Sequence, residues 1–323
     1  MCEDIDILED TIEECWNGIL DKYLLIDHTR KQDPKHFSLP NIVWATDSYI
    51  RFGDEYSAEK PITKELITGK NGKIIQPRAS KSKEEQTVRT KDKAEVFTPS
   101  WVCNAQNNLI DNAWFGKGFE NQFNTENPDN TWTTKRSPII FPEGKTWKDY
   151  VRATRLEITC GEAPYLCSRY DTVSGKIIPI NERIGLLDRK LRIVSENTNE
   201  SGEWLEWAKT ALKNTYGYEL QGDSLLIARE TAFLTFIEYY RQKFGCEVPQ
   251  QSIDGIAYIV SWNFWQMDGL TNTLPYAKII TSQNDLWGVP TEPTNKPVYA
   301  QIRDWRQPRE KQKTEFRNIN KQK

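Results

Sequence analysis

The stretch that decides the fold is residues 156–166, which read Leu-Glu-Ile-Thr-Cys-Gly-Glu-Ala-Pro-Tyr-Leu. Its start is typical of a short apolar β-strand, and the small residues that follow predict a tight turn opening toward a helix. About fifty residues later, 216–220 reads Tyr-Gly-Tyr-Glu-Leu, which predicts a strand that ends in a carboxylate. An apolar helix pattern follows that carboxylate, as in an α/β sheet.

Together these two segments indicate a ligand of the nucleotide type. In open α/β sheets, the backbone of the turn after the first strand approaches the ligand. The acidic residue after the next strand accepts hydrogen bonds from the ribose hydroxyls. Glu219 stands at that position here. The sequence therefore predicts a pocket for an adenosine-containing ligand.

The segments around these two continue an alternation of strands and helices. Apolar residues at helical spacing predict helices at 204–212, 224–244 and 253–261, and short apolar runs predict further strands at 190–194 and 298–302. Such alternation favours a mostly parallel sheet.

The N-terminal part and the C-terminus have a different composition. The spacing of apolar residues predicts an amphipathic helix over 3–26, whereas 60–93 is rich in Lys and Glu and predicts an exposed segment. Thr98 and Pro99 predict the cap and first position of a helix with an apolar side formed by Val102, Ala105, Leu109, Ile110 and Ala113. Residues 306–323 hold seven Lys or Arg against two Glu, which predicts a basic, disordered tail.

The composition argues against several classes of protein. The 323 residues carry a net charge of −3 and contain no apolar run of the roughly 18–20 residues that a membrane span needs. Glu3, Asp4 and Asp6 argue against a signal peptide. The six cysteines form no CxxC pair, and the only histidines are His28 and His36, so we expect no metal site and no histidine catalysis. Scattered thiols are typical of a cytoplasmic protein.

Four segments, in their order along the chain, resemble motifs of the N6-adenine DNA methyltransferases of bacterial restriction–modification systems. Residues 95–99, Glu-Val-Phe-Thr-Pro, are similar to the family's Phe-Thr-Pro motif. Residues 157–166 are similar to its Asp/Glu-Pro-Ala-Cys-Gly-x-Gly-x-Phe-Leu loop, and 216–219 to the strand whose acidic residue holds the ribose. Residues 263–270 are similar to Asn-Ile-Ile-x-Gly-Asp-Ala-Leu.

The resemblance implies an α/β fold with a Rossmann-like methyltransferase sheet over 94–305. A mainly helical and loop N-terminal region, 1–93, would precede it. The implied cofactor is S-adenosyl-L-methionine, with 97–99 near its methionine end, Glu219 on its ribose and Asp268 near its adenine amino group. The full set of residues that the resemblance assigns to the cofactor is Phe97, Thr98, Pro99, Glu157, Thr159, Cys160, Gly161, Glu219 and Asp268.

The sequence departs from the family in two ways. Ala163 replaces the second glycine of the cofactor loop, and the catalytic Asp/Asn/Ser-Pro-Pro-Tyr/Phe tetrapeptide is absent. Asp304 and Trp305 stand at its expected place after the strand predicted at 298–302. We expect Asp304 to accept a hydrogen bond from the adenine amine and Trp305 to stack on the extruded base. An alternative alignment puts the motif at 261–264, Ser-Trp-Asn-Phe.

The function implied by the resemblance is methyl transfer to adenine N6 in double-stranded DNA. The chain would be a modification enzyme, or a modification subunit working with a restriction or specificity subunit. The missing Pro-Pro supports an alternative hypothesis, a non-catalytic, methyltransferase-like subunit that binds cofactor or DNA within a restriction assembly. A methyltransferase for RNA or protein is a third hypothesis.

Overall fold

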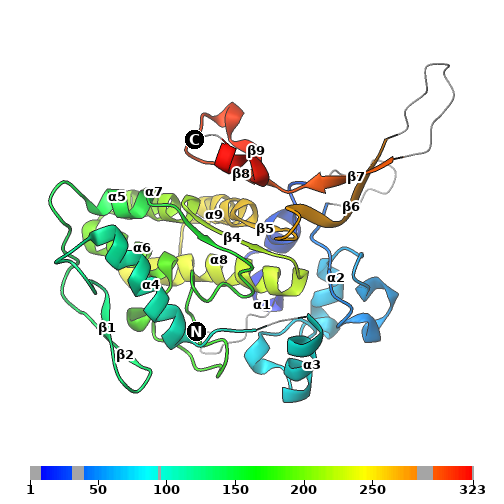
Figure 1. Cartoon of the computed structure of the whole chain (residues 1–323), viewed down its shortest axis with the longest axis horizontal. Coiled ribbons are helices and arrows are strands. Elements are labelled where there is room, and N and C mark those ends of the chain that lie inside the picture. The colour runs from blue at the N-terminus through cyan, green and yellow to red at the C-terminus, as the bar shows by residue number, and fades with distance from the viewer. Residues whose placement is uncertain (1–8, 31–39, 94–95, 282–293, 322–323) are drawn as a thin grey trace.

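The computed structural model describes residues 9–30, 40–93, 96–281 and 294–321 (Figure 1). The molecule is 47% helical and 14% strand, so helices supply most of its core. A small parallel sheet runs through the middle of this helical body. The predicted mixed α/β class is confirmed at this level.

The parallel sheet has three strands in the spatial order β3-β4-β5. They are β3 (Arg155–Glu157), β4 (Thr215–Glu219) and β5 (Phe264–Gln266). The first two are the strands predicted from 156–166 and 216–220. Strand β3 lies at one edge of the sheet, because within the described part of the chain it pairs only with β4.

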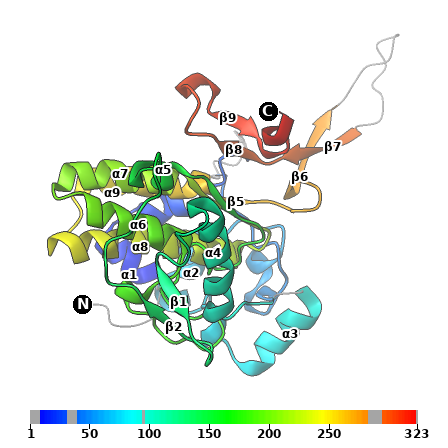
Figure 2. The same ribbon diagram turned by 60° about the vertical axis from the view of Figure 1, so that its left-hand side comes forward.

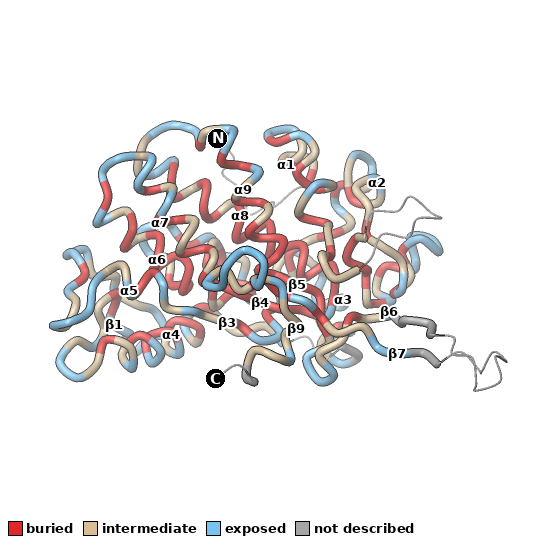
Figure 3. Tube along the Cα trace, turned by 90° about the horizontal axis from the view of Figure 1, so that it is seen from above, coloured by how far each residue is buried: buried red, intermediate tan, exposed pale blue. Residues whose placement is uncertain are grey.

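Four helices follow the alternation predicted from the sequence. They are α6 (Leu186–Asn197), α7 (Ser201–Lys213), α8 (Gly222–Phe244) and α9 (Gln250–Asn263). Helices α7, α8 and α9 confirm the predictions at 204–212, 224–244 and 253–261. Helix α8 is central, because 17 of its 23 residues are buried, as Figure 3 shows along its trace.

The strand predicted at 190–194 is wrong, because these residues lie within α6. Leu187, Leu191 and Val194 are fully buried and recur at helical spacing. A run of five apolar residues is too short to show either the helical period of 3.6 or the strand period of 2. The pattern alone therefore cannot distinguish a buried helix from a buried strand.

The N-terminal region is built from short helices, as expected. They include α1 (Glu9–Cys15), a π-helical turn at Leu20–Leu24, α2 (Lys64–Ile67) and α3 (Lys83–Lys93). The helix predicted over 3–26 is thus divided in two, and its first residues lie outside the described part. Further elements before the sheet include β1 (Asn124–Glu126), β2 (Trp132–Thr134) and α5 (Trp147–Arg152).

The C-terminal strands form two antiparallel pairs. Strands β6 (Thr273–Thr281) and β7 (Thr294–Tyr299) make a hairpin that projects from the body (Figures 1 and 2). Strands β8 (Gln301–Arg303) and β9 (Lys313–Glu315) make the second pair. The strand predicted at 298–302 is therefore divided between β7 and β8. Neither piece joins the parallel sheet, because each has an antiparallel partner.

Residues 301–321, which we name the C-terminal lobe, cover the face of the sheet opposite α8. Phe316 and Ile319 pack with Tyr216 and Trp265 in a second apolar cluster, separate from the main core. The tail predicted as disordered is therefore folded over 306–321, where β9 and the 3₁₀-helix Phe316–Lys321 lie. Phe316 and Ile319 pack on the sheet, and the pairing of β8 with β9 adds hydrogen bonds that hold this segment.

Helix α4 (Ser100–Phe115) buries the opposite face from the one predicted. Leu109 is 68% exposed and Ile110 is 42% exposed, although both were expected on the buried side. The buried side is polar and includes Asn104, Asn107, Asn108 and Asp111. The cap is also shifted, since Pro99 rather than Thr98 is the residue before the first helical one.

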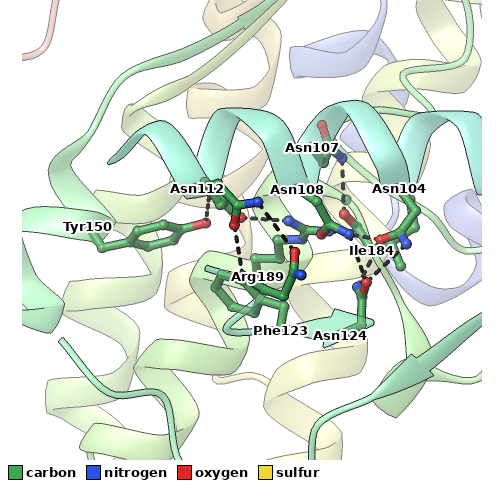
Figure 4. A network of polar contacts seen from close by, with 12 residues as sticks. Asn104, Asn107, Asn108, Asn112, Phe123, Asn124, Tyr150, Ile184 and Arg189 are labelled. Carbon is green, nitrogen blue, oxygen red and sulfur yellow. Dashed lines mark hydrogen bonds and ion pairs between the residues drawn. The ribbon is translucent and has the colours of Figure 1, made fainter. Parts of the chain in front are cut away.

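A buried arginine on α6 explains this orientation (Figure 4). Arg189 is 1% exposed, and its Nη1 lies 2.6 Å from Asp111 Oδ2. Its Nη2 donates to the side-chain oxygens of Asn104 and Asn108, at 2.9 and 2.8 Å. A buried charge without such partners would cost several kcal/mol. The polar residues of α4 must therefore face α6.

The network continues into neighbouring elements. Asn124 of β1 accepts hydrogen bonds from the amides of Asn104 and Asn108, both at 3.0 Å. Tyr150 of α5 donates its hydroxyl proton to Asp111 Oδ1 at 2.8 Å. Four elements are thereby fastened around one guanidinium.

We predict that Asp111→Ala lowers the free energy of unfolding by about 3–5 kcal/mol, because it leaves Arg189 buried without its counter-ion. Urea denaturation followed by circular dichroism would measure the change. The matched control is the double variant Asp111→Leu with Arg189→Met, which removes both charges and should recover part of the loss. A single variant as stable as the unaltered chain would contradict the account of α4.

Candidate functional site

A cavity of about 660 Å³ opens between α4, the loop after β3 and the turn after β4. Its volume lies within the range of small-molecule sites, roughly 300–1,000 Å³. Seven of the nine residues predicted to bind the cofactor line it: Phe97, Thr98, Glu157, Thr159, Cys160, Gly161 and Glu219. Three segments that are distant in the sequence thus meet at the carboxyl ends of β3 and β4, as predicted.

The other two predicted cofactor residues lie outside this lining. Pro99 precedes α4 and does not line the cavity. Asp268 lines a neighbouring hollow of about 380 Å³, and Leu220 belongs to the walls of both. Leu220 therefore stands between the cavity that Glu219 lines and the hollow that Asp268 lines. Its Oδ1 accepts a hydrogen bond from the Leu270 amide at 2.8 Å.

Asp304 and Trp305, the predicted catalytic residues, are not in the cavity. Asp304 pairs with Arg306 at 2.8 Å and lines a different hollow beneath the C-terminal lobe. Trp305 donates its indole proton to Asn263 Oδ1 at 2.7 Å. The antiparallel pairing of β8 with β9 holds both residues within this lobe. The proximity that their predicted role requires is therefore missing.

The alternative segment, 261–264, does not reach the cavity either. Ser261 Oγ lies 2.8 Å from His28 Nε2, and Asn263 donates to the carbonyl oxygens of Leu212 and Thr215. Neither Ser261 nor Asn263 is among the residues that line the cavity. These side chains join buried elements to one another.

The loop after β3 turns tightly through left-handed backbone. Thr159, Gly161 and Ala163 have φ angles of 45°, 54° and 62°. The Cys160 amide donates to the Tyr218 carbonyl oxygen at 2.8 Å, which extends the β3–β4 pairing by one more bond. Ala163 adopts this left-handed conformation at a steric cost that glycine would not have.

Glu219 holds this loop to the end of β4. Its Oε2 accepts from the Gly161 amide at 2.9 Å. Its Oε1 accepts from the amides of Leu220 and Gln221 at 2.8 and 3.1 Å. Burial raises the pKa of Glu219, although these three bonds oppose the shift. Because a carboxylate has about four acceptor positions, roughly one remains for a ligand.

Glu157 and Asn107 present acceptor atoms without protein partners. Glu157 is 9% exposed, and its Oε1 accepts a long bond from the Tyr165 amide at 3.4 Å. Its Oε2 is buried and has no hydrogen-bond partner among the described residues, and the same holds for Asn107 Oδ1. Both residues line the cavity. Unpaired buried acceptors are unfavourable, so each of these two oxygens suits a cationic donor from a ligand.

Burial raises the pKa of Glu157 well above its usual range. The nearby Glu219 carboxylate raises it further, whereas hydrogen bonds from backbone amides oppose the shift. A cation placed beside Glu157 would lower this pKa. Binding of a cationic group here is therefore linked to loss of a proton from Glu157.

Asn107 was not predicted as a site residue. Its Nδ2 donates to the carbonyl oxygens of Tyr165 and Ile184, at 2.9 and 3.0 Å, which directs its oxygen away from these partners. The repetition of amide and acidic residues at 104, 107, 108 and 111 could have indicated a polar buried face on this helix.

The mouth of the cavity is apolar. Val96, Ile110, Leu156 and Ile158 are all exposed, and all four line it. Exposed apolar side chains around a cavity are typical of binding sites. A ligand with an apolar or aromatic part would cover them.

Cys160 is not a catalytic nucleophile. Burial raises the pKa of its thiol well above the usual range, so it stays protonated. Its Sγ lies close to Gly217, where an added Cβ would come within 3.0 Å of the sulfur and 3.1 Å of the Phe264 ring. Its role is to fill space beneath the loop.

The described part of the chain contains no group of three or more His, Cys, Asp or Glu that could hold a metal ion. None of its helices has the length and apolar character that crossing a bilayer requires. No protein-family model matches the sequence, and no match was found among curated proteins or solved structures.

We predict that Gly217→Ala lowers the free energy of unfolding by about 1–3 kcal/mol, because the added methyl group overpacks the space between Cys160 and Phe264. Gly202→Ala is the matched control, since nothing lies within 4 Å of its added Cβ. Within α7 that change should be neutral or stabilise by up to about 1 kcal/mol. Equal stability of the two variants in urea denaturation would contradict the packing described here.

Proposed function

We propose that the chain binds S-adenosyl-L-methionine and provides the cofactor site for adenine-N6 methylation of double-stranded DNA in the cytoplasm. It would be the modification enzyme of a restriction–modification system, or the modification subunit of one. The observation that carries this proposal is the meeting of 97–98, 157–161 and Glu219 around one cavity. Each of these segments resembles a cofactor motif in the sequence.

The order of the strands supports a Rossmann-like relationship. Three parallel strands in the order β3-β4-β5 correspond to one half of a doubly wound sheet, with the ligand beyond the carboxyl ends. In such a fold the other half would extend from the free edge of β3.

The residues present fit the cofactor's functional groups. The remaining acceptor position of Glu219 suits a ribose hydroxyl. The adenine would pack against Leu220 and extend toward Asp268. Glu157 Oε2 and Asn107 Oδ1, which lack partners within the described residues, suit the ammonium of the methionine part. When bound, S-adenosyl-L-methionine supplies an electrophilic methyl group on its sulfonium.

The alternative is a non-catalytic, methyltransferase-like subunit. Two observations favour it. Asp304 and Trp305 lie away from the cavity, and the carboxylate of Glu219 is largely occupied by backbone amides. In that case the groups that hold the adenine amine would come from a restriction or specificity subunit. Methyl transfer to RNA or protein remains a third hypothesis.

Glu219→Ala should weaken binding of S-adenosyl-L-methionine by about 1.5–3 kcal/mol, the range for hydrogen bonds to charged groups. Isothermal titration calorimetry would measure it. Glu206→Ala, which removes an exposed glutamate from α7, should leave the affinity unchanged. A folded Glu219→Ala variant with unaltered affinity would remove Glu219 from the proposed site.

Binding of S-adenosyl-L-methionine should strengthen as the pH rises from about 5.5 to about 7.5, where its amino group stays largely protonated. The raised pKa of Glu157 favours the protonated carboxyl in the free protein, and the ligand's ammonium favours the ionised form. The affinity therefore rises by up to about tenfold per pH unit until Glu157 is ionised in the free protein as well.

Calorimetry across this pH range would measure the effect. Glu157→Gln should flatten the dependence, and adenosine, which lacks the ammonium, should show none. A dependence that survives in Glu157→Gln would assign the titrating group elsewhere.

Methylation of double-stranded DNA, detected as N6-methyladenine, separates the two functions. Activity of the purified chain would support the enzyme. Activity only after addition of a restriction or specificity subunit would support a cofactor-binding subunit that needs its partner. Cofactor binding without methylation in either case would support the non-catalytic alternative.

A further inference from the structure

A cavity of about 320 Å³ lies under the C-terminal lobe, on the face of the sheet opposite α8. We name it the lobe cavity. Its lining comes from the sheet and the lobe alike, so it exists only because residues 301–321 fold over β3, β4 and β5. Its volume is at the lower end of the range for small-molecule sites, roughly 300–1,000 Å³.

The inner part of the lobe cavity is apolar and largely aromatic. Trp265 and Phe316 pack with ring centroids 5.2 Å apart, and Tyr216 lies beside Trp265 at 6.4 Å. Leu156 and Ile319 complete these walls, and Leu156 is 42% exposed. Tyr216 and Trp265 are themselves buried, so the apolar surface open to a ligand comes from Leu156 and the half-buried Phe316. The flat ring of Phe316 favours a planar ring over a branched aliphatic ligand.

The rim of the lobe cavity carries two arginines. Arg306 donates from Nε and Nη2 to the two oxygens of Asp304, at 2.8 and 2.9 Å. Arg317 donates from Nε to Glu315 at 2.7 Å. Their side chains remain 60% and 40% exposed. Because a guanidinium has five N–H donors, each arginine is oriented by its carboxylate and keeps donors for a ligand.

The charge of the lobe differs from that of the whole chain. Residues 301–319 contain six Lys or Arg against three Asp or Glu, whereas the chain has a net charge of −3. The local excess favours an anionic ligand, since clustered positive charge attracts phosphates. The apolar inner walls alone would suit a neutral ring, and the two rim arginines alone would suit free phosphate. Together they suit a ligand that has both a ring and a phosphate.

Two polar side chains could contact the edge of a ring. Thr154 and Asn272 line the lobe cavity, where Thr154 is exposed and Asn272 is half-buried. A hydroxyl and an amide provide both donors and acceptors. These are the groups that the edge of a nucleobase requires.

We propose that the lobe cavity binds a nucleotide, with the base against Leu156 and Phe316 and the phosphate on Arg306 and Arg317. The nucleotide is either free or part of a single strand. This site is distinct from the proposed cofactor cavity, with which it shares only Leu156. It does not depend on the proposed methyl-donor function.

Isothermal titration calorimetry of the full chain at low salt tests the proposal with four probes: AMP, adenosine, inorganic phosphate and a short single-stranded oligo-dA. AMP should bind more tightly than adenosine or phosphate, because it alone of these three meets both the apolar inner walls and the arginines. Oligo-dA binding more tightly than AMP identifies a strand as the ligand, and AMP binding more tightly identifies a free nucleotide.

The decisive variant is Arg306→Ala with Arg317→Ala, and the matched control is Arg309→Ala, which removes an exposed arginine of the same lobe outside the cavity lining. The double variant should weaken AMP binding on the order of tenfold or more, the effect expected from lost bonds to a charged group. Phe316→Leu should weaken AMP and adenosine binding alike, because it removes the ring and no charge. Thermal melting confirms that each variant is folded.

Absence of binding for all four probes would overturn the proposal. So would an equal loss of affinity in Arg309→Ala and in the double variant, since that result reflects the net charge of the lobe and not the cavity. Competition between AMP and S-adenosyl-L-methionine would also overturn it, because the nucleotide would then occupy the main cavity.

Discussion

The hydrogen bonds and ion pair of one buried guanidinium determine which side of α4 faces the main cavity. Arg189 lies within the core on α6, and its charge can remain there only if Asp111, Asn104 and Asn108 surround it. This requirement turns the polar side of α4 inward and leaves Ile110 facing the cavity. The shape of the proposed binding site therefore depends on an interaction on the other side of a helix.

A second constraint lies at the ends of β3 and β4. Glu219 is at once the end of a strand, the anchor of the loop at Gly161 and a wall of the cavity. Glu157, in contrast, has an oxygen that no described residue satisfies. Backbone amides fix one carboxylate, whereas the other keeps an oxygen without a partner among the described residues. The two acidic residues therefore differ in role although both end neighbouring parallel strands.

Local patterns were sufficient to predict β3, β4, α7, α8 and α9, and seven of the nine residues chosen from the motifs line one cavity. What failed depended on contacts between distant residues. The buried face of α4 is set by Arg189, more than seventy residues away, and the fate of 298–302 by its antiparallel partners. Asp304 and Trp305 come directly after β8, so they lie in the C-terminal lobe and not at the main cavity. No period or composition within these segments carries such information.

The account rests on the cavity between α4 and β3 as the site of S-adenosyl-L-methionine. The most direct measurement is a crystal structure of the chain grown with saturating S-adenosyl-L-methionine. The account predicts the ribose beside Glu219, and the ammonium within hydrogen-bonding distance of Glu157 Oε2 and Asn107 Oδ1. Cofactor bound at another surface, or a cavity that contains only solvent under these conditions, would contradict it.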